Sequence, residues 1–180
     1  NRTVNAGSDA AYLELLNFVK THDMADPGNY RYVTERMNVQ SYCDYLISEA
    51  YCGNQDSGNI RFFRSPDYDG GRFHWIVYDV DLGFQNAAVP YGFYHILNPD
   101  GTGAGNSLST VLVNRLLKNP EFRATFIERM AYLMQNVFTT DNLIAHIDRF
   151  EQILKPEIGR DLDKWGGSSG SWSSRVEGLR

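Results

Sequence analysis

The chain has 180 residues, of which 42% are hydrophobic and 13% aromatic, and these fractions exclude a disordered chain. Its 17 Lys and Arg against 22 Asp and Glu give a net charge of −5, which argues against nucleic-acid binding because phosphate contacts need clustered positive charge. The longest unbroken apolar run extends only from Met130 to Met134, so we predict no membrane span. The length suits one ordinary domain, and the start at Asn1, without an initiator Met or a signal-peptide pattern, suggests a piece of a longer protein.

Two helices are expected in the first third of the chain. Ser8-Asp9 can cap the first helix, and the turn-forming residues 26–29 are expected to break it. Gly53-Asn54 is expected to close the second helix, in which Cys43 and Cys52 lie too far apart for a disulfide, so we predict free thiols. The apolar positions at helical spacing are Tyr12, Leu15, Leu16 and Val19 in the first helix, and Val39, Tyr42, Cys43, Leu46 and Ala50 in the second.

The hydrophobic period then changes from helical to alternating. Residues 59–64 and 72–78 alternate and carry Ile, Phe, Trp and Val, as strands do. The turn-rich segment 66–71 separates them, so we predict a β-hairpin.

The rest of the chain is expected to be a long loop followed by helices. Residues 85–105 show no periodicity, which is typical of a functional or mobile loop. One helix should end near Lys118, Asn119 should cap the next, and Thr139 or Thr140 should start a third, followed by a Gly/Ser loop over 166–174. The positions predicted to face inward are Phe122, Phe126, Met130, Leu133 and Val137 in the second of these helices, and Leu143, Ile147, Phe150 and Leu154 in the third. The predicted fold class is therefore mainly α (α+β), helical with one small β-hairpin.

Two polar clusters bracket the hairpin, and they carry the most informative residues. Asp56 and Asn59 precede the first strand, Asp79 and Asp81 follow the second, and pairing of the strands should bring both clusters together. Carboxylate and amide oxygens in such an arrangement suit Mg²⁺, which takes one or two carboxylates plus phosphate oxygens. The alternative interpretation is structural: Asp56 and Asn59 as turn formers and Asp79 as a helix cap.

Other enzymes that use Asp-x-Asp motifs fit less well. Nucleotide-sugar glycosyltransferases and aspartyl-nucleophile phosphatases both need parallel βαβ units, whereas this chain predicts a hairpin. The phosphatases also carry a Thr two residues after the second Asp, where this chain has Gly83. Arg61 and Arg64 could face phosphates or an acidic substrate, or simply lie on a solvated strand face.

The order of parts agrees with a protein kinase. A helix leads to a catalytic loop with a base and a metal-binding Asn, a hairpin follows, and then come a metal-binding Asp, a long loop and a helical lobe. Asp56 is the candidate base, Asn59 the amide ligand, and Asp79 or Asp81 the metal-binding Asp. The spacing departs from ordinary kinases, because Asn59 follows Asp56 by three residues instead of five and no His-Arg precedes Asp56.

Several segments resemble the spore-coat protein H (CotH) kinase family from about Ala10 to the end of the chain. They are Gly53-Asn54-Gln55-Asp56 with Asn59, Trp75 to Asp81, Leu116 to Arg123, and a tail with Pro156-Glu157, Trp165, Trp172 and Arg175-Val176-Glu177. The resemblance implies an atypical, secreted, cell-surface or spore-coat protein kinase that uses ATP and Mg²⁺ (or Mn²⁺) to phosphorylate Ser or Thr of protein substrates. By position, Asp56 matches the family's catalytic Asp and Asp79 its metal-binding Asp, with Asn59 and Asp81 as neighbouring metal or phosphate ligands.

The chain lacks the part of a kinase that holds the nucleotide phosphates. Kinases use a strand Lys beneath a Gly-rich loop, whereas Lys20, Lys118, Lys155 and Lys164 all fall on or after predicted helices. We therefore expect residues 1–180 to be a single domain that resembles a kinase C-terminal lobe, with the N-terminal lobe upstream of Asn1 and little activity or ATP affinity alone. The alternative is a non-catalytic adhesin or surface scaffold that keeps the CotH fold.

Overall fold

A computed structural model describes residues 3–54, 59–84 and 107–180, except for the side chains of residues 107–110. The described chain is mainly helical with one small antiparallel sheet, as predicted. It forms two compact units, Asn1–Met130 and Ala131–Arg180, and α6 begins in the first and ends in the second. Among the described residues no helix has the length and apolarity required to cross a bilayer.

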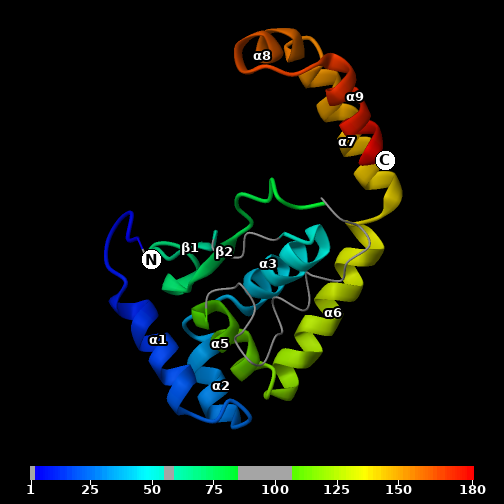
Figure 1. Cartoon of the computed structure of the whole chain (residues 1–180). Coiled ribbons are helices and arrows are strands. Elements are labelled where there is room, and N and C mark those ends of the chain that lie inside the picture. The colour runs from blue at the N-terminus through cyan, green and yellow to red at the C-terminus, as the bar shows by residue number, and fades with distance from the viewer. Residues whose placement is uncertain (1–2, 55–58, 85–106) are drawn as a thin grey trace. The chain divides into compact units, whose positions relative to one another are not determined.

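The first unit begins with α1 (Ala10–Thr21), α2 (Pro27–Thr34) and α3 (Val39–Cys52) (Figure 1). The predicted apolar stripe of α1 is buried, and Gly53 ends α3 with a left-handed φ of 60°. The expected break at residues 26–29 is wrong in part, because this segment starts α2. Asp26 accepts a hydrogen bond from the N–H of Asn29, and Pro27 occupies the first turn, where its missing N–H costs nothing.

The predicted hairpin is present, with shorter strands than expected. β1 (Arg61–Phe63) pairs antiparallel with β2 (His74–Ile76), and Phe62 lies opposite Trp75. The short 3₁₀ helix η1 (Asp69–Gly71) lies in the connection. Aromatic rings join the hairpin to the helices, since the ring centroids of Phe62 and Tyr12 of α1 lie 4.4 Å apart and those of Trp75 and Tyr42 of α3 lie 4.6 Å apart. The hairpin is therefore fixed on the core rather than projecting from it.

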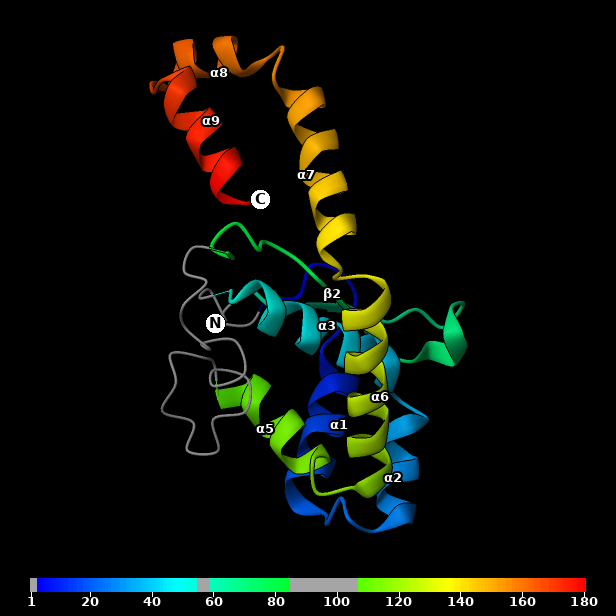
Figure 2. The same ribbon diagram turned by 90° about the vertical axis from the view of Figure 1, so that its right-hand side faces the viewer.

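The helix α5 (Ser107–Leu116) and the first part of α6 (Pro120–Asn136) complete the first unit, and Figure 2 shows α6 turning back from the end of α5. Asn119 caps α6 as predicted: Oδ1 accepts from the N–H groups of Glu121 (2.8 Å) and Phe122 (3.2 Å). Its Nδ2 also donates to the carbonyl of Met24 (2.9 Å). Arg129 of α6 makes a bidentate ion pair with Asp44 of α3 at 2.8 and 2.9 Å, which joins the two helices.

Replacement of Phe122 by alanine should strongly destabilise the first unit. The side chain is 0% exposed and its ring centroid lies 6.5 Å from that of Tyr42 and 6.4 Å from that of Phe126. Removing a buried phenyl ring typically lowers the free energy of unfolding by about 3–5 kcal/mol. Urea unfolding measures this change, and Ile127→Ala on the same helix, where the side chain is 66% exposed, is the matched control. An equal free energy of unfolding in the two variants would contradict the placement of Phe122 in the core.

The second unit contains α7 (Thr140–Leu154), α8 (Ile158–Trp165) and α9 (Ser169–Gly178). Thr139 caps α7 as predicted, but the inward positions were wrong in part: Leu143 and Ile147 are half-buried, whereas Phe150 and Leu154 are exposed. Within this fully described segment no residue of α7, α8 or α9 is fully buried. Phe150 is 59% exposed and Val137, just after α6, is 41% exposed. The expected Gly/Ser loop was also wrong in part, because α9 begins inside it with Ser168 as its cap. Arg180 pairs with Asp148 and Glu151 and so joins the end of the chain to α7.

Asp69 in the hairpin connection makes the stability of the first unit depend on pH. It accepts hydrogen bonds from Nδ2 of Asn38 (3.0 Å) and from the Arg72 guanidinium, and its Oδ2 lies 2.7 Å from Nε2 of His74. These contacts, that of Asn38 first, lower the pKa of Asp69 from 3.8 to about 2. Since the pKa is lower in the folded protein, the stabilisation is complete above the unfolded-state value and is lost as the pH falls from about 4 to about 2.

The variant Asp69→Asn should therefore lose less stability than the wild type when the pH falls from about 4 to about 2. Asn tolerates the left-handed φ of 50° found at this position, so the backbone conformation is preserved. Thermal unfolding between pH 4 and pH 2 should show a smaller loss of Tm in the variant than in the wild type. Asp67→Asn, an exposed change in the same connection, should keep the wild-type slope, and identical slopes for all three proteins would refute the assignment.

Candidate functional site

The candidate site lies where the chain leaves β2. Asp79 follows the strand by three residues, is exposed, and has a left-handed φ of 58°. Few residues other than glycine adopt this conformation, although Asp does so more readily than most, and such backbone conformations concentrate at functional sites. The sequence pattern alone did not indicate this conformation.

The hairpin register brings Asn59 to Asp79. Because Arg61 pairs with Ile76, the residues just before β1 lie beside those just after β2. Asn59 Nδ2 donates a hydrogen bond of 2.8 Å to Asp79 Oδ2. The structure thus brings these two predicted residues together.

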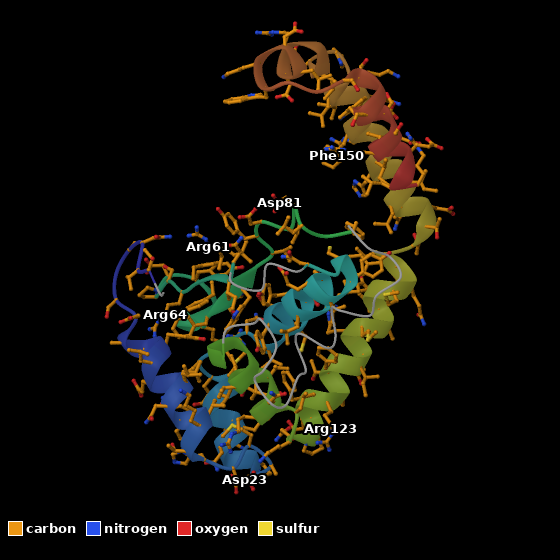
Figure 3. The ribbon with its side chains drawn as sticks, viewed as in Figure 1. Asp23, Arg61, Arg64, Asp81, Arg123 and Phe150 are labelled. Atoms are coloured by element: carbon orange, nitrogen blue, oxygen red, sulfur yellow. The ribbon has the colours of Figure 1, made fainter. Side chains whose placement is uncertain are left out.

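The other two predicted residues have different positions. Asp81 is exposed in the turn after Asp79 (Figure 3). Asp56 lies outside the described residues, between Asn54 and Asn59. Among the described candidate residues, the structure therefore shows a direct contact for the pair Asn59 and Asp79.

The turn after Asp79 packs on the end of α3. The N–H of Gly83 donates to the carbonyl of Val80 (2.8 Å), and the N–H of Phe84 donates to the carbonyl of Cys52 (2.6 Å). A Cβ at position 83 would lie 2.9 Å from the Val80 oxygen and 3.1 Å from the Cys52 Cβ, so a glycine is required. This close approach fixes the segment that carries Asp79 and Asp81 against the helix.

A buried polar pair at the end of α3 was not predicted. Glu49 is 8% and Asn54 5% exposed, and Asn54 Nδ2 lies 2.8 Å from Glu49 Oε2 and 3.4 Å from the carbonyl oxygen of Asp79. One signal was present in the sequence: Glu49 follows Tyr42 and Leu46 at positions i+7 and i+3 and so occupies the apolar stripe of α3. A charged residue type on a buried helical stripe indicates a special role.

Burial also controls the chemistry of the nearby thiols. Cys43 is buried, Cys52 is partly buried, and both are free thiols. Burial raises the pKa of Cys43 to about 12 and that of Cys52 to about 11, with Glu49 adding to the effect at Cys52. Neither group is a reactive thiolate at neutral pH.

Two arginines of the hairpin lie over aromatic rings. The Arg61 guanidinium is 4.5 Å from the ring centroid of Tyr78, directly before Asp79, and that of Arg64 is 5.4 Å from the centroid of Phe73. Figure 3 shows Arg61 and Arg64 on the hairpin. Arg61 is exposed and thus places a positive charge close to the candidate site.

The donor set at Asn59 and Asp79 fits a hard cation bound together with phosphate. It offers one carboxylate and one amide, and no group of three or more His, Cys, Asp or Glu suited to a metal occurs in residues 3–54, 59–84 and 107–180. Mg²⁺ commonly takes only one or two protein carboxylates and completes its shell with water and substrate phosphates. The carboxylate of Asp79 and the amide of Asn59 are thus oxygen donors of the kind that Mg²⁺ takes.

The lysines lie where the sequence predicted. Lys20 is in α1 and Lys164 in α8, Lys118 lies two residues after α5, and Lys155 lies directly after α7. None of them is on a strand of the described chain.

Comparison with protein families gives one match that covers the chain: the model described as CotH kinase protein matches residues 1–180. No curated protein and no solved structure matches the sequence.

Proposed function

The chain belongs to the CotH kinase family, and on this premise we propose that it acts as an atypical protein kinase that transfers the γ-phosphoryl group of ATP to Ser or Thr. Its protein substrates would be secreted or exposed on a cell or spore surface. The observation that supports this most is the Asn59–Asp79 pair at the end of the hairpin, a carboxylate and an amide in hydrogen-bond contact. The left-handed conformation of Asp79 adds support, because it presents the carboxylate from a constrained backbone.

Asp79 and Asn59 would hold the divalent cation, and Asp81 is a further candidate ligand two residues along. Mg²⁺ or Mn²⁺, when bound with ATP, would neutralise phosphate charge that develops during transfer. The protein's own contribution is positioning and electrostatic stabilisation. The exposed Arg61 guanidinium would add a positive charge beside the transferred group.

Asp56 would be the base. It lies two residues after Asn54 and three before Asn59, and both of these flanking residues contact Asp79. The carboxylate of Asp56 would orient the acceptor hydroxyl and accept its proton as the phosphoryl group transfers.

We propose further that the first unit corresponds to the lower, mainly helical lobe of a protein kinase. A kinase also needs a strand Lys on the α- and β-phosphates. All lysines of this chain lie in helices or within two residues after them, so none of them lies on a strand of the described chain to make this contact.

A non-catalytic adhesin or scaffold is the second candidate. The second unit favours it, since large apolar side chains are exposed on its helices, including Trp165 at 73% and Ile153 at 57%. Such side chains often mark contact surfaces for other proteins.

Calorimetric titration of the natural protein that carries these residues separates the two candidates. ATP with Mg²⁺ should release heat on binding, and the signal should disappear when EDTA replaces the metal. If no binding heat is measured at millimolar nucleotide, the kinase proposal is overturned and the non-catalytic adhesin or scaffold is favoured.

A further inference from the structure

Glu49 is placed where elementary physical chemistry disfavours a carboxylate. It lies in the last turn of α3, where the helix dipole favours cations, and α3 has no basic residue there. It is also only 8% exposed, although a buried carboxylate loses hydration. Residues that break local rules in this way occur mainly where function requires them.

The partner of Glu49 connects it to the candidate site. Glu49 Oε2 lies 2.8 Å from Asn54 Nδ2, and the N–H of Asn54 donates to the carbonyl of Glu49 at 3.2 Å. Asn54 is thus held through both its backbone N–H and its side-chain amide. The same Nδ2 lies 3.4 Å from the carbonyl oxygen of Asp79, whose carboxylate accepts from Asn59.

Asp79 is therefore held on two sides. Asn54 contacts its peptide carbonyl and Asn59 contacts its carboxylate, so backbone and side chain are both fixed. A left-handed φ of 58° costs energy for a residue other than glycine, so this conformation needs surrounding contacts to persist. The contact through Asn54 is one of them.

We infer that Glu49 is a positioning residue for Asp79, which it orients through the buried Asn54 amide. This inference rests on the proposed function, in which Asp79 holds the divalent cation. Groups that orient a metal ligand typically change metal affinity or activity by about 10–100-fold when removed.

Two substitutions at Glu49 separate positioning from packing. Glu49→Leu fills a similar volume but cannot accept a hydrogen bond, whereas Glu49→Gln keeps an acceptor oxygen for Asn54. Glu49→Leu removes a buried carboxylate, which favours the fold, but it also leaves the buried Asn54 amide without this acceptor, which opposes it. We therefore expect a small change in Tm together with clearly weaker metal binding in Glu49→Leu, and wild-type behaviour in Glu49→Gln.

The first readout is Mn²⁺ binding, measured by electron paramagnetic resonance on the natural protein that carries these residues. Glu49→Leu and Asn54→Ala should raise the Mn²⁺ dissociation constant by about tenfold or more, whereas Glu49→Gln should stay close to wild type. Asn119→Ala is the matched control, because it removes a buried amide and its hydrogen bonds at the start of α6 and should leave Mn²⁺ affinity unchanged.

The second readout does not need the metal. The amides of Gly83 and Phe84 are hydrogen-bonded in the turn after Asp79, so their hydrogen exchange reports how firmly the segment is held. Exchange should accelerate in Glu49→Leu and Asn54→Ala but not in Glu49→Gln or Asn119→Ala.

The two readouts distinguish the inference from the proposed function. A wild-type protein that binds no Mn²⁺ would overturn the metal role of Asp79, while accelerated exchange in Glu49→Leu would still establish positioning. Unchanged exchange in Glu49→Leu, or equal effects of Glu49→Leu and Glu49→Gln, would overturn the inference.

Discussion

Replacement of Asp79 by asparagine is expected to abolish detectable phosphoryl transfer while leaving the fold intact. The side chain is exposed, so no core packing is lost, and asparagine tolerates the left-handed φ of 58°. Loss of the carboxylate removes the charge that would hold the cation against the phosphates. Electrostatic groups of this kind contribute about 10²–10³-fold to turnover, and loss of the metal adds to that. Asp79→Ala should have the same effect on transfer.

Two controls make this result specific. Asp67→Asn removes an exposed carboxylate from the hairpin connection and should retain wild-type transfer. Asp81→Asn tests which acid is the principal metal ligand, and we expect it to retain more activity than Asp79→Asn because Asp79 is the one that contacts Asn59. Transfer by Asp79→Asn within a few-fold of wild type would exclude a metal role for Asp79.

Replacement of Asp56 by alanine should reduce turnover by about 10²–10⁴-fold, which is the usual contribution of a general base. In contrast to Asp79→Asn, this variant should bind ATP and Mn²⁺ as the wild type does, because the proposed role of Asp56 is confined to the acceptor hydroxyl. Steady-state kinetics should accordingly show a lower kcat with little change in the KM for ATP. Loss of Mn²⁺ affinity in Asp56→Ala would reassign it from base to metal ligand, and unchanged kcat would remove it from the mechanism.

The parts of the fold that follow a single hydrophobic period could be predicted from sequence. The stripe of α1, the end of α3 at Gly53 and the presence of the hairpin all follow from local patterns that tertiary contacts reinforce. α2 was missed because Asp26-Pro27 is compatible with both a helix break and a helix start. Only the contacts of the following residues decide between them.

Burial in the second unit could not be predicted from periodicity. Phe150 and Leu154 follow the helical repeat of α7, yet they are 59% and 48% exposed. A periodic stripe indicates which residues share a face of a helix, but not whether another element covers that face.

At the candidate site the sequence predicted that Asn59 and Asp79 lie close together, but not the contacts around them. Asn59 and Asp79 could be paired because antiparallel strands bring their outer ends together. The contact of Glu49 with Asn54 could not, since the chain turns sharply at Gly53 between them. The left-handed conformation of Asp79 depends on tertiary contacts that no local pattern encodes.

Transfer of labelled phosphate from [γ-³²P]ATP by the natural protein that carries these residues tests the central claim most directly. With Mg²⁺ or Mn²⁺ present, we predict label on serine or threonine of a protein acceptor, or of the protein itself, and none after EDTA or in Asp79→Asn. Wild-type protein that transfers no label, or label that persists unchanged in Asp79→Asn, would contradict a kinase centred on Asp79.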